Sequence, residues 1–373
     1  MNKHAFLSAS ASHRWLNCPP SAKLCADTPD QSNSYAEEGT CAHDLCVHKL
    51  EKALGRDTKD PTENLSYYDS EMENCAEEYC AFCMEQIAEV KKNCKSPLIM
   101  VEQRVSYDKW VPNGYGTADF ICIGEKELLI TDFKYGLGVL VDATKNSQLM
   151  CYALGALDCY GFLYDIETVT MTIFQPRREN VSSYTMNVAD LLKWADEVLA
   201  PTALLALEGK GEFKAGDHCT FCKVKATCRK RCEHNLELAK YDFEMPSTLD
   251  TIEIASILPL IDELVSWGND VKEFALQQAL SGVEYPGFKI VEGRSKRAFT
   301  NTTAVALAVE NAGYDPYEKK LLGITAMTSL LGKAKFNTLL GSYITKAPGK
   351  PTLVSENDKR TAMNTAAEDF KEN

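Results

Sequence analysis

Two acidic residues and a lysine interrupt a pair of apolar, β-branched segments within residues 116–134. A short polar break separates the segments, and the pattern predicts a β-hairpin. With a two-residue loop at the break, Asp119 lies directly opposite Asp132, and Lys134 points to the same face. Two carboxylates this close repel one another unless a divalent cation lies between them. The spacing therefore predicts a metal site beside an ammonium group.

The same residues also allow simpler arrangements. The acids and the lysine could lie on the solvated face of the hairpin. The pair Glu125-Lys126 is not a favoured two-residue turn, and a three-residue loop would place the acids on opposite faces. Glu102 interrupts the apolar strand predicted at 98–106. It could approach the metal site, or pair with Arg104 or Lys109.

Three more polar residues lie on predicted helices. His43 falls in the first two turns of a helix predicted at 35–54. A lone histidine there is most simply structural, although a neutral imidazole is also a metal ligand. Gln148 and Tyr152, four positions apart on a helix predicted at 143–157, share one helical face. They could grip phosphate, or form the polar edge of the helix.

A close pair of cysteines with a third shortly after it indicates metal binding. The segment contains Cys219, Cys222 and Cys228, followed by Cys232. With Cys232 as the fourth ligand, the site would be local and hold zinc or an iron–sulfur cluster. With the distant Cys18 as the fourth ligand, it would join the two ends of one domain. Free thiols are the alternative that this spacing disfavours.

The order of these motifs resembles the PD-(D/E)xK nuclease superfamily. Asp119, followed by Asp132-Phe133-Lys134, is similar to its D…(D/E)-x-K signature. Gln148 with Tyr152 is similar to the Q-x-x-x-Y motif of the RecB-like branch, and residues 39–43 to its G-x-x-x-H. The resemblance implies an α/β (α+β) fold with a restriction-endonuclease-like core, in which helices flank a mixed central sheet.

The resemblance also implies a metal-dependent deoxyribonuclease, more an exonuclease on DNA ends or single strands than a sequence-specific endonuclease. Lys134 would orient the attacking water or neutralise the phosphorane, while Gln148 and Tyr152 would position the DNA backbone. One or two Mg²⁺ or Mn²⁺ ions would be held by His43, Asp119, Asp132 and the backbone carbonyl of Phe133.

An early Cys-Pro pair resembles the RecB-like nucleases of the AddB type, which carry an iron–sulfur cluster. In that pattern a [4Fe-4S] cluster is surrounded by Cys18, Cys219, Cys222 and Cys228; Zn²⁺ at the cysteines is the alternative. The whole chain also resembles a family of phage and prophage proteins, DUF2800. That resemblance implies a setting in phage DNA replication or recombination, with a protein of that machinery as a partner.

The composition agrees with a globular protein that binds DNA only locally. The chain has 373 residues, 45% of them apolar, and a net charge of −13, which argues against indiscriminate coating of nucleic acid. It contains no run of about 18 apolar residues and begins with no apolar signal core, so a cytoplasmic protein without a membrane partner is expected. Fifteen scattered cysteines favour thiols and metal ligands over disulfides.

The hydrophobic pattern also predicts the elements that must position these residues. Beside the hairpin, strands are expected at 98–106, 167–175 and 181–188, and helices at 35–54, 70–93, 143–157 and 189–208. A nuclease domain at 1–240 precedes a mostly helical region at 241–373, with amphipathic helices at 249–280 and a small basic hairpin at 286–300.

Three hypotheses for function follow. The first is a metal-dependent DNA exonuclease. The second is a non-catalytic DNA-binding or scaffold protein that retains a nuclease fold; an intact set of Asp119, Asp132 and Lys134 argues against it. The third is a local zinc module fused to an unrelated α+β enzyme.

Overall fold

The computed structural model describes residues 5–28, 34–237, 249–292, 299–317 and 321–344. The chain divides into two compact units, Met1–Gly293 and Arg294–Asn373. The first unit contains the sheet and every residue predicted for a site.

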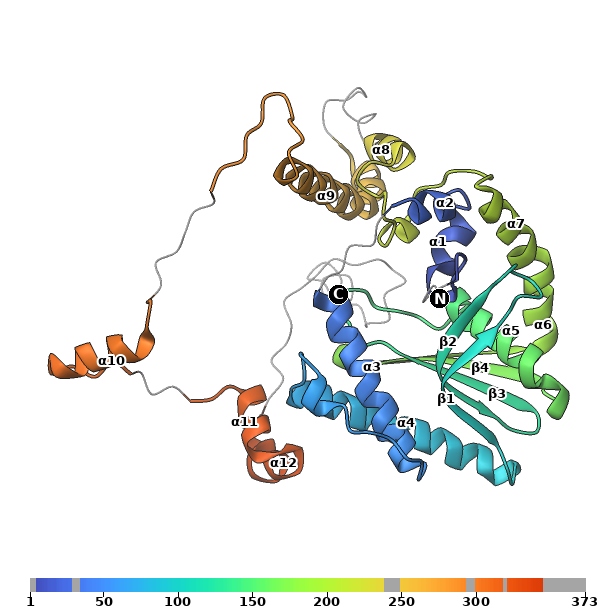
Figure 1. Cartoon of the computed structure of the whole chain (residues 1–373), viewed down its shortest axis with the longest axis horizontal. Helices are drawn as coiled ribbons and strands as arrows, with labels where there is room; N and C mark the ends of the chain where they lie inside the picture. The colour runs from blue at the N-terminus through green and yellow to red at the C-terminus, as the bar shows by residue number, and fades with distance from the viewer. Residues whose placement is uncertain (1–4, 29–33, 238–248, 293–298, 318–320, 345–373) are drawn as a thin grey trace, which may run out of the picture. The chain divides into compact units, whose positions relative to one another are not determined.

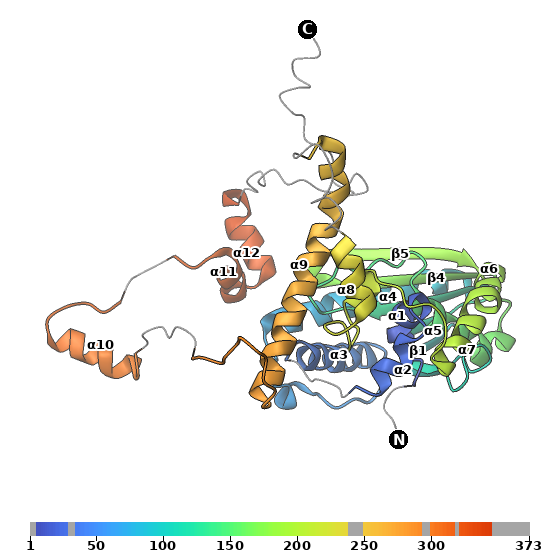
Figure 2. The ribbon, with the colours of Figure 1, turned by 90° about the horizontal axis from the view of Figure 1, so that it is seen from above.

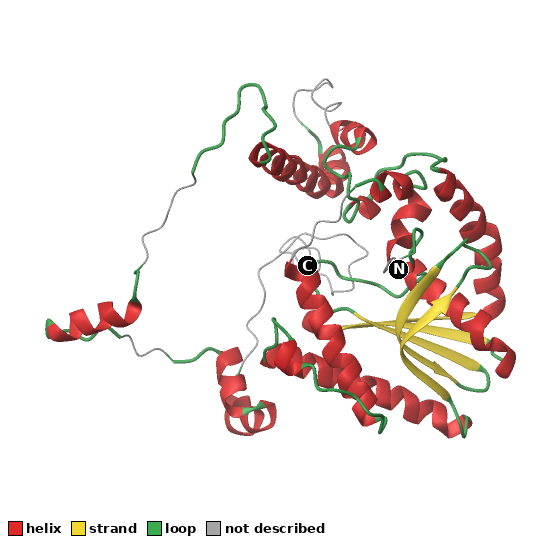
Figure 3. Cartoon of the chain, viewed as in Figure 1, coloured by secondary structure: helices red, strands yellow, loops and turns green. Residues whose placement is uncertain are grey.

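A five-stranded mixed sheet forms the centre of the first unit (Figure 3). Its strands, in spatial as in chain order, are β1 Leu98–Ser106, β2 Tyr115–Ile123, β3 Glu127–Phe133, β4 Thr168–Gln175 and β5 Asn180–Asn187. Only β3 and β4 run parallel; the other neighbours are antiparallel. The parallel pair requires a crossover, which the helix between them provides. The predicted mixed α+β architecture is therefore confirmed.

The hairpin of β2 and β3 has the expected two-residue loop. Ile123 pairs with Leu128, and the amide of Gly124 donates to the carbonyl of Glu127 at 2.9 Å. The last ladder pair before the acids is Phe120 with Thr131. One further step along the same register places Asp119 opposite Asp132, as predicted.

Helices cover both faces of the sheet (Figure 1). One face packs against α3 Ser34–Ala53 and α4 Ser70–Asn93. The other packs against α1 Ser12–Asn17, α5 Ser147–Tyr160, α6 Val188–Trp194 and α7 Ala200–Glu208. A 3-10 turn, Ala9–Ala11, precedes α1, and α2 Ser21–Ala26 follows it; a π-helical segment, Ala195–Leu199, joins α6 to α7.

Each face has its own apolar core. On the α3/α4 face, Leu45 and Tyr79 pack with Phe120 and Phe133 of the sheet. On the opposite face, α5 is buried along most of its length, from Leu149 to Ala156. Since a strand between two helical layers must bury both sides, β3 and β4 are almost continuously buried.

The first unit extends past the division after residue 240 that the sequence suggested. Helix α9, Thr251–Leu280, lies beside α8, Arg229–Leu236 (Figure 2). Asp270 of α9 accepts from the buried Arg231 at 2.6 Å and pairs with Lys225 at 2.7 Å. These ion pairs hold α9 to the sheet-bearing unit.

The second unit is helical where it is described. Its helices are α10 Thr302–Asn311, α11 Ile324–Leu331 and α12 Lys333–Leu340. The basic hairpin predicted at 286–300 falls partly on residues 293–298, which lie outside the described residues. The described residues on either side of that gap, 286–292 and 299–300, form no strand.

Candidate functional site

A cleft of about 560 Å³ lies between α3, the N-terminal segment and the first three strands. Of the seven residues predicted as catalytic or metal-binding, all but Phe133 line it: His43, Asp119, Asp132, Lys134, Gln148 and Tyr152. They come from α3, β2, the end of β3 and α5, so tertiary packing brings together residues that span more than one hundred positions.

Three acids form one row across the sheet. Val101 pairs with Phe120 and Gln103 with Ala118, so Glu102 faces Asp119 between these two pairs. Asp119 in turn faces Asp132 of β3. The β1–β2 ladder skips the Glu102–Asp119 step, and the β2–β3 ladder ends just before Asp119 and Asp132. The acids therefore lie where β2 is not paired through its backbone to either neighbouring strand, while Asp132 stays paired with Ile173 of β4.

Asp119 is held by the neighbouring strand instead of by a backbone pair. Its Oδ2 accepts from the amide of Phe133 at 2.7 Å, and its Oδ1 lies 3.5 Å from Nδ1 of His43. Burial, reinforced by the charge of Asp132, raises the pKa of Asp119 from its ordinary 3.8 to about 8. The cleft thus holds a carboxyl group that favours the protonated form until a positive charge arrives.

Asp132, Lys134, Gln148 and Tyr152 form a single polar network. Nε2 of Gln148 lies 3.0 Å from Oδ1 of Asp132 and 3.0 Å from the hydroxyl of Tyr152. Nζ of Lys134 donates to Oε1 of Gln148 at 3.3 Å and lies 2.9 Å from Oδ2 of Asp132. Burial lowers the pKa of Lys134, but the Asp132 and Asp119 carboxylates outweigh burial and leave it raised. The ammonium group is therefore charged at neutral pH.

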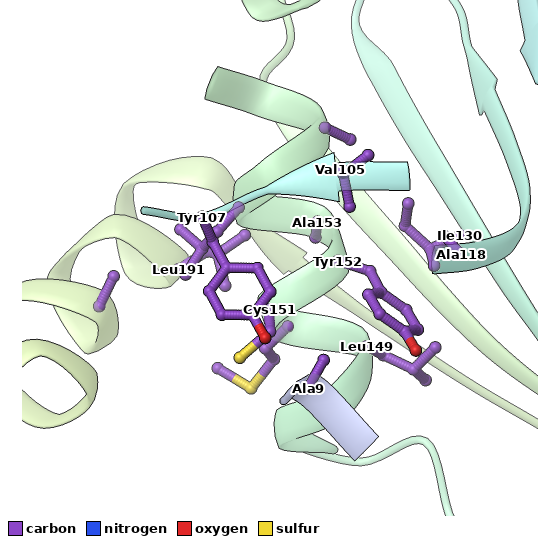
Figure 4. Close-up of a cluster of buried hydrophobic side chains, with 14 of the residues drawn as sticks. Ala9, Val105, Tyr107, Ala118, Ile130, Leu149, Cys151, Tyr152, Ala153 and Leu191 are labelled. Carbon is purple, nitrogen blue, oxygen red and sulfur yellow. The ribbon is translucent and has the colours of Figure 1, made fainter. Parts of the chain in front are cut away.

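The N-cap of helix α5 determines where Gln148 and Tyr152 lie relative to the sheet. Oδ1 of Asn146 accepts from the amides of Gln148 and Leu149, so the helix begins at Ser147 and not at residue 143. Gln148 consequently lies in the first turn, where its side chain reaches the end of β3. One turn later, Tyr152 packs within the apolar cluster near Ala118 and Ile130 (Figure 4).

His43 enters the cleft from α3, whose neighbouring Ala42 and Leu45 are buried against the sheet. Its ring packs edge-on against Phe133, with 5.3 Å between ring centroids. Burial lowers the pKa of His43 more than the nearby Asp132 raises it. The imidazole is therefore neutral at physiological pH, the form that binds metals.

Glu102 is the acid that sequence reasoning left undecided. The structure places it in the cleft, and burial together with Asp119 raises its pKa. Its backbone has φ of +50°, a left-handed conformation that is uncommon for a residue with a side chain. Such strain costs about 1–3 kcal/mol and is found mainly where the surrounding structure enforces it, often at functional sites.

The cysteines gather around a second, small cavity of about 20 Å³. Its lining includes all four predicted ligands: Cys18, Cys219, Cys222 and Cys228. Cys232, on the first turn of α8, is not among the lining residues. A fifth thiol, Cys25 of α2, lies 3.7 Å from Cys222.

Neither site is a ready-made metal cage. Among the residues that the structure describes, no group of three or more His, Cys, Asp or Glu side chains is arranged to hold a metal ion. In the cleft, protein hydrogen bonds and the Lys134 ion pair occupy much of the carboxylate surface. To bind a cation there, the carboxylate and imidazole groups would have to move closer together.

The chain belongs to the family described as "Protein of unknown function (DUF2800)". The model of that family matches residues 4–361. The predicted resemblance to DUF2800 is thereby confirmed. A solved structure titled "Crystal structure of SSO0001" is 14% identical and covers 50% of this chain and 95% of its own length, with a TM-score of 0.23. A similarity this low does not assign a shared fold.

Sequence reasoning missed several residues of the cleft in this DUF2800 chain. The N-terminal segment contributes Ser8 and Ser10, and the loop after α3 contributes Thr58 and Lys59. Asp44 also lines the cleft; its place directly after His43 was the one signal in the sequence. Within the described residues, no helix is both long enough and apolar enough to cross a bilayer.

Proposed function

We propose that this DUF2800 protein is a metal-dependent deoxyribonuclease with a PD-(D/E)xK core of the RecB-like kind. The observation that carries the proposal is the cleft in which Asp119 and Asp132 lie in register beside the charged Lys134, with His43 opposite. Two carboxylates largely shielded from solvent, Asp119 at 13% and Asp132 at 3% side-chain exposure, disfavour each other's charged form and have little structural value. They suit a site where a divalent cation restores the charge balance.

The donor chemistry fits Mg²⁺ or Mn²⁺. Carboxylate oxygens are the ligands that these hard cations prefer, and Mg²⁺ usually keeps several waters and few protein ligands. Oδ2 of Asp132 is buried and has no hydrogen-bond donor in proper geometry among the described groups, although Lys134 lies beside it. The ligands would be Asp119, Asp132 and His43, with Glu102 and the carbonyl of Phe133 as further candidates. A bound cation would supply an activated water and offset charge on the scissile phosphate.

Three side chains of the cleft would have the other roles in the reaction. Lys134 is a fixed positive charge that can donate to the attacking water or to a phosphate oxygen. Gln148 contacts both Asp132 and Lys134, so it fixes the distance between the carboxylate and the ammonium group. Tyr152 orients Gln148 through its hydroxyl. Gln148 and Tyr152 would thus act mainly by holding the reacting groups, in addition to contacting DNA.

The substrate is proposed to be DNA ends or single strands, in phage or prophage replication or recombination. A cleft of about 560 Å³ is in the range of small-molecule sites, and so would admit a nucleotide or two of one strand. An exonuclease that admits one strand end at a time fits this size. A recombination or replication protein is the proposed partner.

The cysteine centre is proposed to hold a [4Fe-4S] cluster, or Zn²⁺ as the alternative. Four thiols around one cavity suit either soft-ligand site. A cavity of about 20 Å³ holds no more than about one water, so the thiols would have to separate to admit a cluster. Because Cys18 follows α1 and the other three follow α7, a metal here would tie both ends of the sheet-bearing region together.

Nuclease assays of two variants test the main proposal. Lys134→Ala and Asp132→Ala are expected to lose most cleavage of labelled single- and double-stranded DNA in Mg²⁺ or Mn²⁺. Lys126→Ala is the matched control, since this lysine lies on the same hairpin, is exposed and pairs only with Glu167 in the described contacts. Blocking the 5′ or 3′ end of the substrate then reports polarity. Cleavage at the wild-type rate by both variants would remove the site assignment.

The rival hypothesis is a DNA-binding or scaffold protein without catalysis. It predicts DNA binding with no metal-dependent cleavage by the wild-type protein under any of these conditions. The same assay therefore separates the two.

Metal analysis addresses the cysteine centre. Anaerobically purified protein should contain iron and sulfide and absorb in the visible range, and Cys18→Ser should lose both while Cys159→Ser keeps them. If the purified protein is colourless and contains stoichiometric zinc, the centre is a zinc site and not an iron–sulfur cluster. Retention of that zinc in Cys18→Ser would favour the local zinc module.

A further inference from the structure

Cys25 and Cys222 form a close thiol pair that no predicted ligand set explains. Their Sγ atoms are 3.7 Å apart, although the residues are 197 positions apart in the chain. Both side chains are buried, with 3% and 7% of their surface exposed. A disulfide has an S–S length of about 2.05 Å, so closing the bond requires each sulfur to move by about 0.8 Å.

The surrounding contacts hold these two segments together. Nζ of Lys223, next to Cys222, donates to the carbonyl of Thr28 at 3.0 Å, just beyond α2. A second contact joins the same two parts of the chain: Nε2 of His13, on α1, lies 3.3 Å from Oδ2 of Asp217. These contacts tie the N-terminal helices to the segment that carries Cys222, so the fold keeps the two sulfurs close together.

We propose that Cys25 and Cys222 are an oxidation site, and that peroxide joins them in a disulfide when the cysteine centre holds no metal. The proposal does not depend on nuclease activity. Cys222 lines the cavity of about 20 Å³, which holds about one water, so peroxide reaches its sulfur only when the lining side chains move apart.

The chemistry balances with hydrogen peroxide as the only co-reactant. One thiolate sulfur attacks the O–O bond, which breaks; the sulfur becomes a sulfenic acid and hydroxide leaves, to be protonated to water. The second thiol then attacks that sulfur, the S–O bond breaks, and a second water leaves. In sum, two thiols lose two electrons and two protons, and one peroxide becomes two waters.

Oxidation and metal binding therefore exclude one another at this centre. Cys222 is both a proposed metal ligand and one half of the disulfide, and a disulfide sulfur is no longer a thiolate ligand. A metal ion on Cys222 should protect Cys25 from being linked, and reduction of the disulfide should restore metal uptake.

Peptide mapping of the full-length wild-type protein is the primary test. Metal-stripped protein is treated with hydrogen peroxide, denatured, alkylated and digested, and the linked peptides are identified by mass spectrometry. The Cys25–Cys222 peptide should be the main cross-link among Cys18, Cys25, Cys219, Cys222 and Cys228. Preloading with Zn²⁺ should reduce its yield at least tenfold, and dithiothreitol should remove it.

Two variants serve as controls. Cys159→Ser, a partly exposed thiol at the end of α5, should form the same linked peptide as wild type. Cys25→Ser should leave Cys222 alkylated or oxidised without this link. Cross-linking of Cys222 mainly to another cysteine, or an equal yield with and without Zn²⁺, would overturn the proposal. Since the wild-type result decides the question, poor folding of a variant does not affect it.

Discussion

At the scale of single residues, the raised pKa of Asp119 links the cleft to the pH dependence of stability. Its pKa rises from 3.8 to about 8 on folding, so the folded protein retains a proton that the unfolded chain releases between these values. The contribution of this group to stability is therefore complete below about pH 4 and is lost as pH rises through about 8. The buried acid makes the metal-free protein less stable at alkaline pH.

The first prediction concerns this pH dependence. Without metal, the melting temperature should fall by several degrees between about pH 5 and about pH 9, and Asp119→Asn should flatten the fall. Added Mn²⁺ should restore wild-type stability at the alkaline end, because metal binding competes with the proton for the carboxylate. Glu125→Gln, at the exposed hairpin loop, is the control. An equal fall in Asp119→Asn and wild type would contradict the role of Asp119.

The second prediction concerns Gln148, which contacts Asp132, Lys134 and Tyr152. Gln148→Ala leaves the carboxylate and the ammonium group without their shared partner. Cleavage rate or Mn²⁺ affinity should fall roughly 10–100-fold, the usual effect of removing a group that orients metal ligands.

Gln86 provides the control for this substitution. Its Oε1 accepts from Thr131 at 2.8 Å, so it holds the same strand from the α4 side. Gln86→Ala should cost about 1 kcal/mol of stability and leave cleavage unchanged. If Gln86→Ala and Gln148→Ala reduced cleavage equally, the effect of Gln148→Ala would come only from lost stability.

At the scale of elements, the contact between β2 and α5 decides whether the network assembles. Gly116 of β2 allows the ring of Tyr152 to approach: a Cβ at this position would lie 2.6 Å from Cε1 of that ring and 3.4 Å from Cβ of Ala9. Since the separation is far below van der Waals contact, any larger residue would force the helix or the ring to move.

The third prediction follows from this contact. Gly116→Ala should lower stability by about 1–3 kcal/mol through overpacking, and should also reduce cleavage because Tyr152 no longer reaches Gln148. The midpoint of chemical denaturation and the cleavage rate are the measurements. Gly136→Ala, where an added Cβ meets no atom within 4 Å, should change neither. A Gly116→Ala protein as stable as wild type would show that the sheet and α5 adjust freely.

At the scale of the whole molecule, ion pairs attach α9 to the sheet-bearing unit. The side chain of Arg231 is only 3% exposed, and its partner Asp270 is 15% exposed. Removing one member of a buried pair leaves the other charged and without compensation, which costs about 3 kcal/mol or more.

The fourth prediction is that Asp270→Ala releases α9 without unfolding the sheet. Hydrogen exchange should increase in residues 251–280 and stay slow in the strands, and protease should cut near α9 first. Asp262→Ala, an exposed acid on the same helix, should behave like wild type. Faster exchange in the strands to the same extent would mean that α9 and the sheet unfold as one unit.

Much of the fold was accessible from local patterns. The helices expected at 35–54 and 70–93 and the strand expected at 98–106 differ from the observed elements by no more than one residue at either end. The two-residue loop at Glu125-Lys126 also set the register that aligns Asp119 with Asp132. Side-chain periodicity and loop length carry this information because they act over a few neighbouring residues.

Other features could not be read from such patterns. The start of α5 depends on the cap that Asn146 forms, and α9 joins the first unit because Asp270 meets Arg231. Glu102 was undecided because its left-handed backbone breaks the alternation by which a strand assigns its faces.

By itself, then, the sequence determined which residue types were present for chemistry and how the hairpin aligned two of them. Only the tertiary structure decided that His43 and Glu102 share their cleft, that Gln148 joins Asp132 to Lys134, and that Cys25 meets Cys222. The reason is physical: neighbours along a strand are set by backbone geometry, whereas neighbours from distant segments are set by which apolar faces pack together.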